Sequence, residues 1–312
     1  MQPSNIAQTL EAISAPRLAS YRSMFKPASD HELYGVYCWN EAVSSGLGSI
    51  ISTVEVTLRN AIHRELSRRY GPTTAATSYN WYDSLVLASG SAARIADIKG
   101  QQKWAYKTIT PNDVIAGLTF GFWKHLLDVK VAKDGSPFAA NHLLANVLPN
   151  HPNSDAAYWS QQKRQDAIYS RLDMIADIRN RVAHHEPVWK FGKLKEERRH
   201  RHNYVPKIVK MKPANPLEAI ERLNLVFNRT FELLHWVSSY RALDYKASGN
   251  YYRARFLLSE DGLNAYRSLA PLKEVSLLGA RRMMKTRTPF DGGVCLTHLG
   301  KRAAIVLPWK YF

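Results

Sequence analysis

The segment LGSIISTVEVTLRNAIHREL at residues 47–66 decides the fold class, because its apolar residues recur at spacings of three and four. That spacing places them on one face of an α-helix, as Leu47, Ile50, Ile51, Val54, Leu58, Ile62 and Leu66. The helical pattern starts at Asp30, and Gly71-Pro72 stops it. The pattern predicts one long helix that buries an apolar stripe.

Other segments also have helical periodicity or helix-start signals. Pro187 ends one of these helices, Asn215 caps another that begins at Pro216, and Thr110 or Asn112 caps a third. The helices are expected at residues 92–98, 114–127, 155–185, 216–234 and 251–268, with a short β-like ending at 303–307. The predicted class is therefore mainly α, a helical bundle with additions.

The same pattern divides the chain into three parts. Residues 1–30 are expected to form a lead-in with a short helix, and residues 31–243 the helical domain. Residues 190–213 are a basic insertion in that domain, and residues 244–312 are a small, less regular C-terminal extension of unknown role.

Charge gives the first indication of function. The 312 residues include 43 Lys and Arg against 26 Asp and Glu, a formal charge of +17 with an isoelectric point near 9.8. Such a surplus favours a polyanionic partner, nucleic acid or an anionic membrane surface. The first residues do not resemble a secretory signal, no window resembles a membrane span, and only Cys38 and Cys295 could form a disulfide. We therefore expect a cytoplasmic protein, no membrane partner, and RNA or DNA as ligand.

The segment IRNRVAHHEP at residues 178–187 is the candidate active site. Cleavage of RNA by attack of the ribose 2′-hydroxyl needs an acid or base that titrates near neutral pH, and His184 is of that kind. Arg179 can hold the phosphate and stabilise the charge of the transition state, while Asn180 orients either group. No metal or other cofactor is needed. Arg179 and His184 are five positions apart, roughly 140° around a helix, so they converge only on a substrate or a second copy.

A plainer interpretation of this segment is a basic helix end. Positively charged side chains offset the negative end of the helix dipole, and histidines there are common. The residues of this segment by themselves leave both interpretations open.

Three blocks of the sequence resemble Abi-like (abortive infection) proteins of the HEPN superfamily. They are the segment 178–185, the run from Leu33-Tyr34 through Trp39-Asn40 to residues 54–63, and LTFGFW at residues 118–123. The blocks occur in the order of that family and span roughly residues 15–240. The last seventy or so residues resemble no family that we can name.

The resemblance implies a HEPN-type helical bundle that forms a homodimer, with two Arg-x4-6-His motifs in one composite cleft. It also implies a metal-independent endoribonuclease that acts in phage defence or as a toxin, with a possible RNA or protein antitoxin. By position Arg179 matches the motif arginine, Asn180 the polar residue after it, His184 the motif histidine and His185 the second histidine. Glu186 and the residues after it depart from the family pattern, so no role is carried over to them.

A second polar group lies on the long helix. Glu55, Arg59 and His63 follow one another at four-residue spacing, with Asn60 adjacent. Such a ladder on a surface stabilises a helix only weakly. Because its neighbours are apolar, we expect this stripe to be partly buried. The family resemblance favours a polar site here, so we expect the stripe to line the cleft as support for Arg179 and His184. In the block 118–123 we expect Phe120, Phe122 and Trp123 to serve core or dimer packing, with Trp123 closest to the cleft.

The insertion Lys190–Lys212 has nine Lys and Arg against two Glu. It is either a solvated loop or a surface that grips RNA phosphates without reading sequence. Its candidate RNA-binding residues are Lys193, Lys195, Arg198, Arg199, Arg201 and Lys207. His200 and His202 lie next to arginines and are poor metal ligands, and the order of His184, His185 and Glu186 is not that of a zinc protease. Arg281, Arg282 and Lys285 form a second, weaker phosphate-binding candidate.

Two functions therefore compete. The first is the endoribonuclease described above, and the second is a non-catalytic RNA-binding protein that holds a regulatory RNA in a toxin–antitoxin-like system. A membrane protease is disfavoured, because the sequence offers no membrane span to hold its site.

Overall fold

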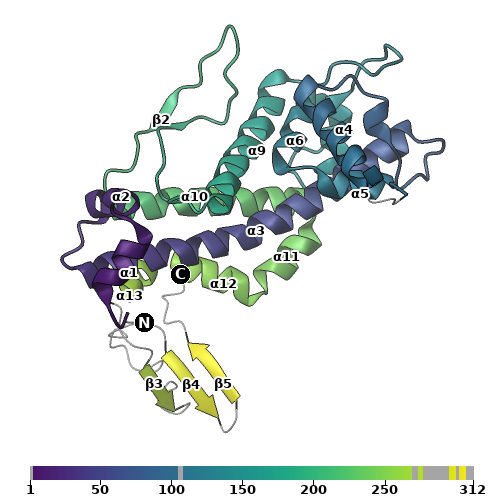
Figure 1. Ribbon diagram of the computed structural model, residues 1–312. Helices are drawn as coiled ribbons and strands as arrows, with labels where there is room; N and C mark the ends of the chain where they lie inside the picture. Colours follow the sequence, from purple (N-terminus) through teal and green to yellow (C-terminus); the bar gives the residue numbers. More distant parts are fainter. Residues whose placement is uncertain (1–2, 105–107, 269–272, 277–294, 300–301, 307–312) are drawn as a thin grey trace.

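The computed structural model describes residues 3–104, 108–268, 273–276, 295–299 and 302–306, and this part of the chain is mainly helical (Figure 1). The predicted mainly α bundle is thereby confirmed. The longer helices are α3 (Asp30–Tyr70), α4 (Ser89–Trp104), α9 (Gln162–Ala183) and α10 (Pro216–Val237). The shorter ones are α1 (Ile6–Ile13), α2 (Ala15–Phe25), α5 (Pro111–Gly117), α6 (Phe120–His125), α7 (Ala140–Val147), α8 (Ala156–Trp159), α11 (Ser239–Lys246), α12 (Gly249–Leu257) and α13 (Glu260–Arg267), with 3-10 turns at Trp81–Asp83 and Leu126–Asp128.

Helix α3 is the spine of the bundle, as its periodicity predicts. The side chain of Ser29 accepts a hydrogen bond from the backbone N–H of Glu32 and so caps its start, and Gly71 follows its end. Helices α2, α7, α9, α10, α12 and α13 all pack against it. In Figure 1, α10 and α9 lie on one side of α3 and α11 and α12 on the other.

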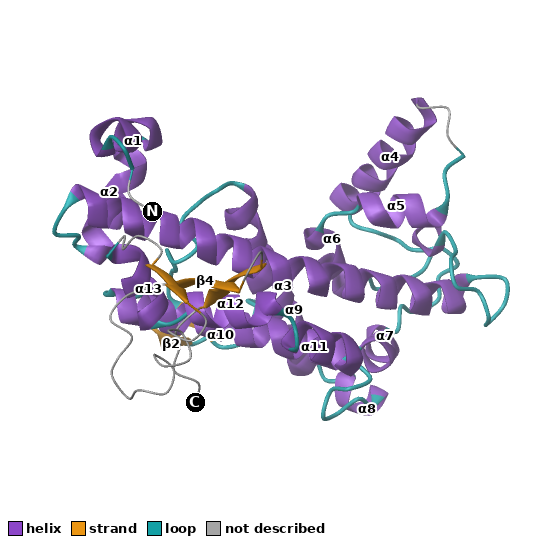
Figure 2. Cartoon of the chain, turned by 90° about the horizontal axis from the view of Figure 1, so that it is seen from below, coloured by secondary structure: helices purple, strands orange, loops and turns teal. Residues whose placement is uncertain are grey.

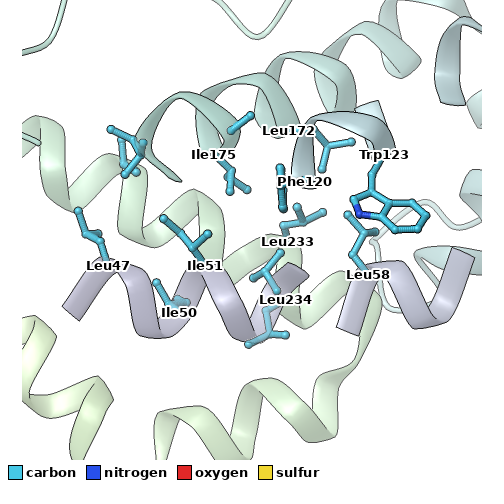
Figure 3. Close-up of a cluster of buried hydrophobic side chains, with 14 of the residues drawn as sticks. Leu47, Ile50, Ile51, Leu58, Phe120, Trp123, Leu172, Ile175, Leu233 and Leu234 are labelled. Carbon is cyan, nitrogen blue, oxygen red and sulfur yellow. The ribbon is translucent and has the colours of Figure 1, made fainter. Parts of the chain in front are cut away.

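The core lies where α3 meets α9, α10 and α6. Figure 3 shows Leu47, Ile50, Ile51 and Leu58 of α3 facing Leu172 and Ile175 of α9, Leu233 and Leu234 of α10, and Phe120 and Trp123 of α6. Each of these ten side chains is buried. Trp123 is fully enclosed, which agrees with a packing role but not with the expectation that it reaches a cleft.

Four segments expected to contain a single helix each contain two. The run 114–127 splits into α5 and α6, because Leu118 and Thr119 adopt extended backbone; Thr110 caps α5 with a reciprocal capping box. The segment 251–268 splits into α12 and α13, where the Ser259 side chain accepts from the N–H of Gly262 at 3.0 Å. A short helix, α8, precedes α9, and residues 1–30 contain two helices, α1 and α2, in place of one.

Two helices late in the chain, α12 and α13, pack on the spine. Trp39 of α3 donates from Nε1 to the carbonyl of Leu257 at 2.9 Å, and this bond is buried. Gly35 approaches α13 so closely that a Cβ there would lie 2.1 Å from the carbonyl oxygen of Tyr266. Helices α12 and α13 of the C-terminal segment are therefore tied to α3.

Two small sheets complete the fold. In the insertion, β1 (Leu194–Lys195) pairs antiparallel with β2 (Ile208–Lys210). Near the C-terminus, β3 (Lys273–Ser276) runs parallel to β4 (Cys295–Leu299), which pairs antiparallel with β5 (Arg302–Val306), so the expected β ending is confirmed (Figure 2). Arg281, Arg282 and Lys285 lie outside the described residues. Within the described part, no helix combines the length and the apolar character that crossing a membrane requires.

Candidate functional site

The motif predicted as the active site lies at the C-terminal end of α9. The helix ends at Ala183, and His184 is its C-cap, with its N–H bonded to the carbonyl of Asn180 at 2.9 Å. His185 then adopts a positive φ of 54°, a backbone conformation that is unfavourable for residues with a side chain. The surrounding contacts must therefore stabilise it. The backbone turns there, and the side chains of Asn180, His184 and His185 are all exposed.

Contacts from the N-terminal helices hold this turn. Arg17 of α2 donates from Nη1 to the carbonyl of His185 at 2.7 Å. Asn40 of α3, which is 3 % exposed, accepts through Oδ1 from the buried N–H of Val188 at 3.0 Å. These bonds join the segment after the motif to two helices far away in the sequence.

The next residue, Trp189, anchors the same segment in the core. Its ring meets the rings of Tyr21 and Phe25 edge-on, with centroids 5.3 and 5.0 Å apart. A buried aromatic cluster of this kind contributes both area burial and specific ring geometry. The turn that carries His184 is therefore fixed by hydrogen bonds with α2 and α3 and by the buried ring of Trp189, which follows it in the sequence.

Arg179 lies against α3, next to the polar stripe predicted there. Burial raises the pKa of Glu55, and the guanidinium groups of Arg179 and Arg59 oppose that rise because they stabilise the carboxylate. Nε of Arg59 is buried, and no hydrogen-bond partner for it lies among the described residues. The structure thus brings Glu55, Arg59 and Arg179 into one cluster, which we call the arginine–glutamate cluster.

His63 does not join this cluster. Nδ1 of its buried ring accepts from Nε1 of Trp81 at 2.9 Å, and its Nε2 lies 3.1 Å from Oγ of Ser78. Burial lowers the pKa of His63, which favours the neutral ring. His63 lies two turns beyond Glu55 towards the C-terminal end of α3, about 12 Å along the helix axis. The end of α9 that carries the motif lies in the opposite direction along α3, because Val182 approaches Gly48. The structure gives His63 a packing role, while the neighbouring Asn60 is exposed.

Within one chain, Arg179 and His184 are separated as their spacing predicts. Arg179 is half-buried beside α3, whereas His184 is exposed at the helix end. Among the described residues, no hydrogen bond links their side chains. If Arg179 and His184 act on one phosphate, a substrate or a second chain must therefore bring the two groups together.

The basic insertion is tied to the bundle by ion pairs. Arg201 binds Asp166 of α9 through Nε and Nη2, at 2.9 and 2.6 Å, and Arg199 binds Asp128. Arg198 lies with its guanidinium 4.0 Å from the ring centre of Tyr204. These three arginines therefore direct their charge to protein partners. The other three candidates for RNA binding, Lys193, Lys195 and Lys207, have exposed side chains.

Sequence reasoning missed two residues of the site and could have found one of them. Asn40 carries a polar amide within an apolar stripe of a helix, so it is expected to be buried. Because buried polar groups are hydrogen-bonded, a partner for it could have been predicted. Arg17 carries no such signal, because its partner is a backbone carbonyl 168 positions away. In the part of the chain that the structure describes, no group of three or more His, Cys, Asp or Glu side chains is placed to hold a metal ion.

Comparison with known proteins adds one match. The family model described as Abi-like protein matches residues 8–190, more than half of the chain, and so confirms the resemblance to Abi-like proteins. The matched region includes α3, α9 and the motif at the end of α9. A search of curated proteins and a search of solved structures each found no match.

Proposed function

The chain belongs to the Abi-like protein family, which suggests a function in abortive infection, and from this premise we propose that it is a metal-independent endoribonuclease. The observation that carries the proposal is the placement of Arg179 beside Glu55 and Arg59, with His184 exposed after the next turn. A guanidinium that binds the phosphate and an exposed imidazole that transfers a proton are the two groups that cleavage by the ribose 2′-hydroxyl requires.

In the proposed reaction, the 2′-hydroxyl loses a proton and the leaving 5′-oxygen gains one; His184 carries out one of these transfers and water the other. The 2′-oxygen forms a bond to phosphorus, and the bond from phosphorus to the 5′-oxygen breaks. Arg179 binds the phosphate and stabilises the charge that grows on its oxygens, while Glu55 and Arg59 orient Arg179. Asn180 and His185, both exposed, stand beside the same substrate. Because no atom is lost or gained apart from these protons, no redox partner is needed.

The exposed lysines of the insertion give the proposal a binding surface. Lys193, Lys195 and Lys207 would contact phosphates along the RNA without reading bases. Each such contact releases counterions, so the affinity for RNA should fall steeply with salt. The excess of positive charge over the whole chain supports the same partner.

We further propose that two chains share the site. Arg179 and His184 point roughly 140° apart around α9, and a second copy of the motif would place one group of each chain on opposite sides of a phosphate. Mixing an Arg179→Ala chain with a His184→Ala chain should restore part of the activity if each composite site needs both residues. Light scattering should show a dimer; a monomer that cleaves RNA would contradict the shared site.

The activity is tested by incubating the purified chain with total RNA in EDTA. Cleavage should persist in EDTA and be lost in the Arg179→Ala/His184→Ala variant. A matched control, His235→Ala/Arg241→Ala, removes the same residue types from exposed positions of α10 and α11 and should cleave like the wild type. Equal cleavage by both variants, or inhibition by EDTA, would rule out the proposal. Tight RNA binding without cleavage would favour the non-catalytic alternative.

A further inference from the structure

A cavity of about 470 Å³ lies between α9, α10 and the insertion. Met174 of α9, Phe191 and Leu194 of the insertion, and Arg222, Leu225 and Arg229 of α10 line it. Its size lies within the range of small-molecule sites. None of the residues assigned to the proposed active site lines this cavity.

Arg222 gives the cavity a buried positive charge. It is 7 % exposed, and among the described residues no carboxylate forms an ion pair with it. Its guanidinium donates from Nη2 to the carbonyl of Met211 at 3.2 Å and lies 5.8 Å from the ring centre of Phe191. A buried arginine normally has an anionic partner, because leaving its charge unpaired costs free energy. Arg222 therefore has the donors and the charge to bind an anion, and the described residues do not supply one.

Arg229 adds a second positive charge on the same face of α10, two turns further along. Its Nε lies 3.5 Å from Oε1 of Glu197, but Arg171 already holds that carboxylate with two bonds of 3.0 Å. Burial lowers the pKa of Arg222, and the charge of Arg229 lowers it further, so the two guanidinium groups repel each other. An anion between them would relieve that repulsion.

Three of the four carboxylates on the cavity wall, those of Asp173, Glu196 and Glu197, have partners within the protein. Asp173 binds Lys124, and Glu196 accepts from the N–H of Lys207 and from the hydroxyl of Tyr204. Asp177 also lines the cavity; burial and the nearby Asp173 raise the pKa of its carboxyl group, while Lys124 and Arg181 oppose the rise. Lys193, Lys195 and Arg181 also line the cavity. Positive charge is thus in excess around it.

We infer that this cavity binds a phosphate monoester, with Arg222 and Arg229 as the residues that hold the phosphate. A monoester carries close to two negative charges at neutral pH, whereas an internal phosphodiester of RNA carries one. Arg222 and Arg229 together carry two positive charges, and among the described residues only Arg229 has a carboxylate nearby, which it shares with Arg171. Two such charges match the monoester better than the diester. Phe191 offers a ring face beside Arg222 against which a base can pack. The ligand is then a free nucleotide or the 5′-phosphate end of an RNA.

The test measures equilibrium binding of AMP and of adenosine to the full chain by calorimetry. AMP should bind, and adenosine should bind at least roughly tenfold more weakly, because it lacks the charged group. Arg222→Met and Arg229→Met should each weaken AMP binding by roughly tenfold or more. Arg241→Met, which removes an arginine from an exposed position of α11, is the matched control and should leave AMP binding unchanged. Circular dichroism confirms folding, and Arg222→Lys replaces Arg222→Met if the latter does not fold.

A second arm identifies the source of the phosphate. Tighter binding of a 5′-phosphorylated oligoribonucleotide than of its 5′-hydroxyl form assigns the site to RNA ends, and equal binding of the two oligonucleotides beside tight AMP binding assigns it to free nucleotides. The Arg179→Ala/His184→Ala chain should bind AMP like the wild type, so the outcome does not depend on ribonuclease activity. No AMP binding, equal binding of AMP and adenosine, or unchanged binding in both arginine variants would overturn the inference.

Discussion

Replacing Asn40 by alanine should loosen the turn that carries His184. Oδ1 of Asn40 is the acceptor for the N–H of Val188 at 3.0 Å, and both residues are buried. The substitution leaves that N–H without a partner in a place that bulk water does not reach. An unsatisfied buried donor costs about 1–3 kcal/mol, so the free energy of unfolding should fall by that amount.

Asn60→Ala provides the matched control, because Asn60 is exposed on the same helix. Both substitutions gain the same helix propensity, so their difference isolates the buried hydrogen bond. Urea denaturation followed by circular dichroism measures the free energy of unfolding. Hydrogen exchange should show faster exchange of the Val188 amide in Asn40→Ala alone. The reasoning is refuted if the two variants unfold within ~0.5 kcal/mol of each other and Val188 exchanges as in the wild type.

Three further predictions concern packing, pH and the insertion. Gly35→Ala should destabilise the fold by ~1–3 kcal/mol, because the added Cβ would overlap a carbonyl of α13. Gly48→Ala is the control: its Cβ would have its nearest neighbour at 3.6 Å, so the stability should stay unchanged or rise by up to ~1 kcal/mol. Equal thermal midpoints of the two variants would contradict this. Because burial lowers the pKa of His63 in the folded state, the unfolded state takes up the proton more readily, so stability should fall as pH drops below 6.5. His63→Gln should remove up to ~1.4 kcal/mol per pH unit of that dependence in urea titrations, and an unchanged slope would refute the assignment. Asp166→Ala should remove the ion pair of Arg201 and make the insertion more sensitive to trypsin. If trypsin cleaves the variant at the same rate as the wild type, this prediction is wrong.

The long helix and the position of the motif could be predicted because both depend on local sequence. The three-and-four spacing of residues 47–66 survives in α3, and Pro187 does follow the end of α9. The break at Leu118 was missed, because an apolar run of that length satisfies helical periodicity while its backbone changes to extended. Local signals thus locate helices better than they locate interruptions.

Contacts between distant segments could not be predicted from the sequence. The charges of Arg199 and Arg201 are visible in the sequence, but their carboxylate partners lie on other elements, and only the fold brings them together. His63 fitted the four-residue spacing of a polar stripe, yet a bond from Trp81 assigns it to packing. Arg222 and Arg229 could have been noticed, since their seven-residue spacing places them on the same face of α10 as the buried Val226 and Leu233.

The central claim is that Arg179 and His184 promote attack of the ribose 2′-hydroxyl on the neighbouring phosphate. The chemical identity of the new 3′ ends tests this most directly, in RNA cut by the purified chain in EDTA. The proposed reaction predicts 2′,3′-cyclic phosphate ends, or the 3′-phosphate that follows from them, and their loss in the Arg179→Ala/His184→Ala variant. New 3′-hydroxyl ends would contradict the account, because they arise when water, and not the 2′-oxygen, attacks the phosphate.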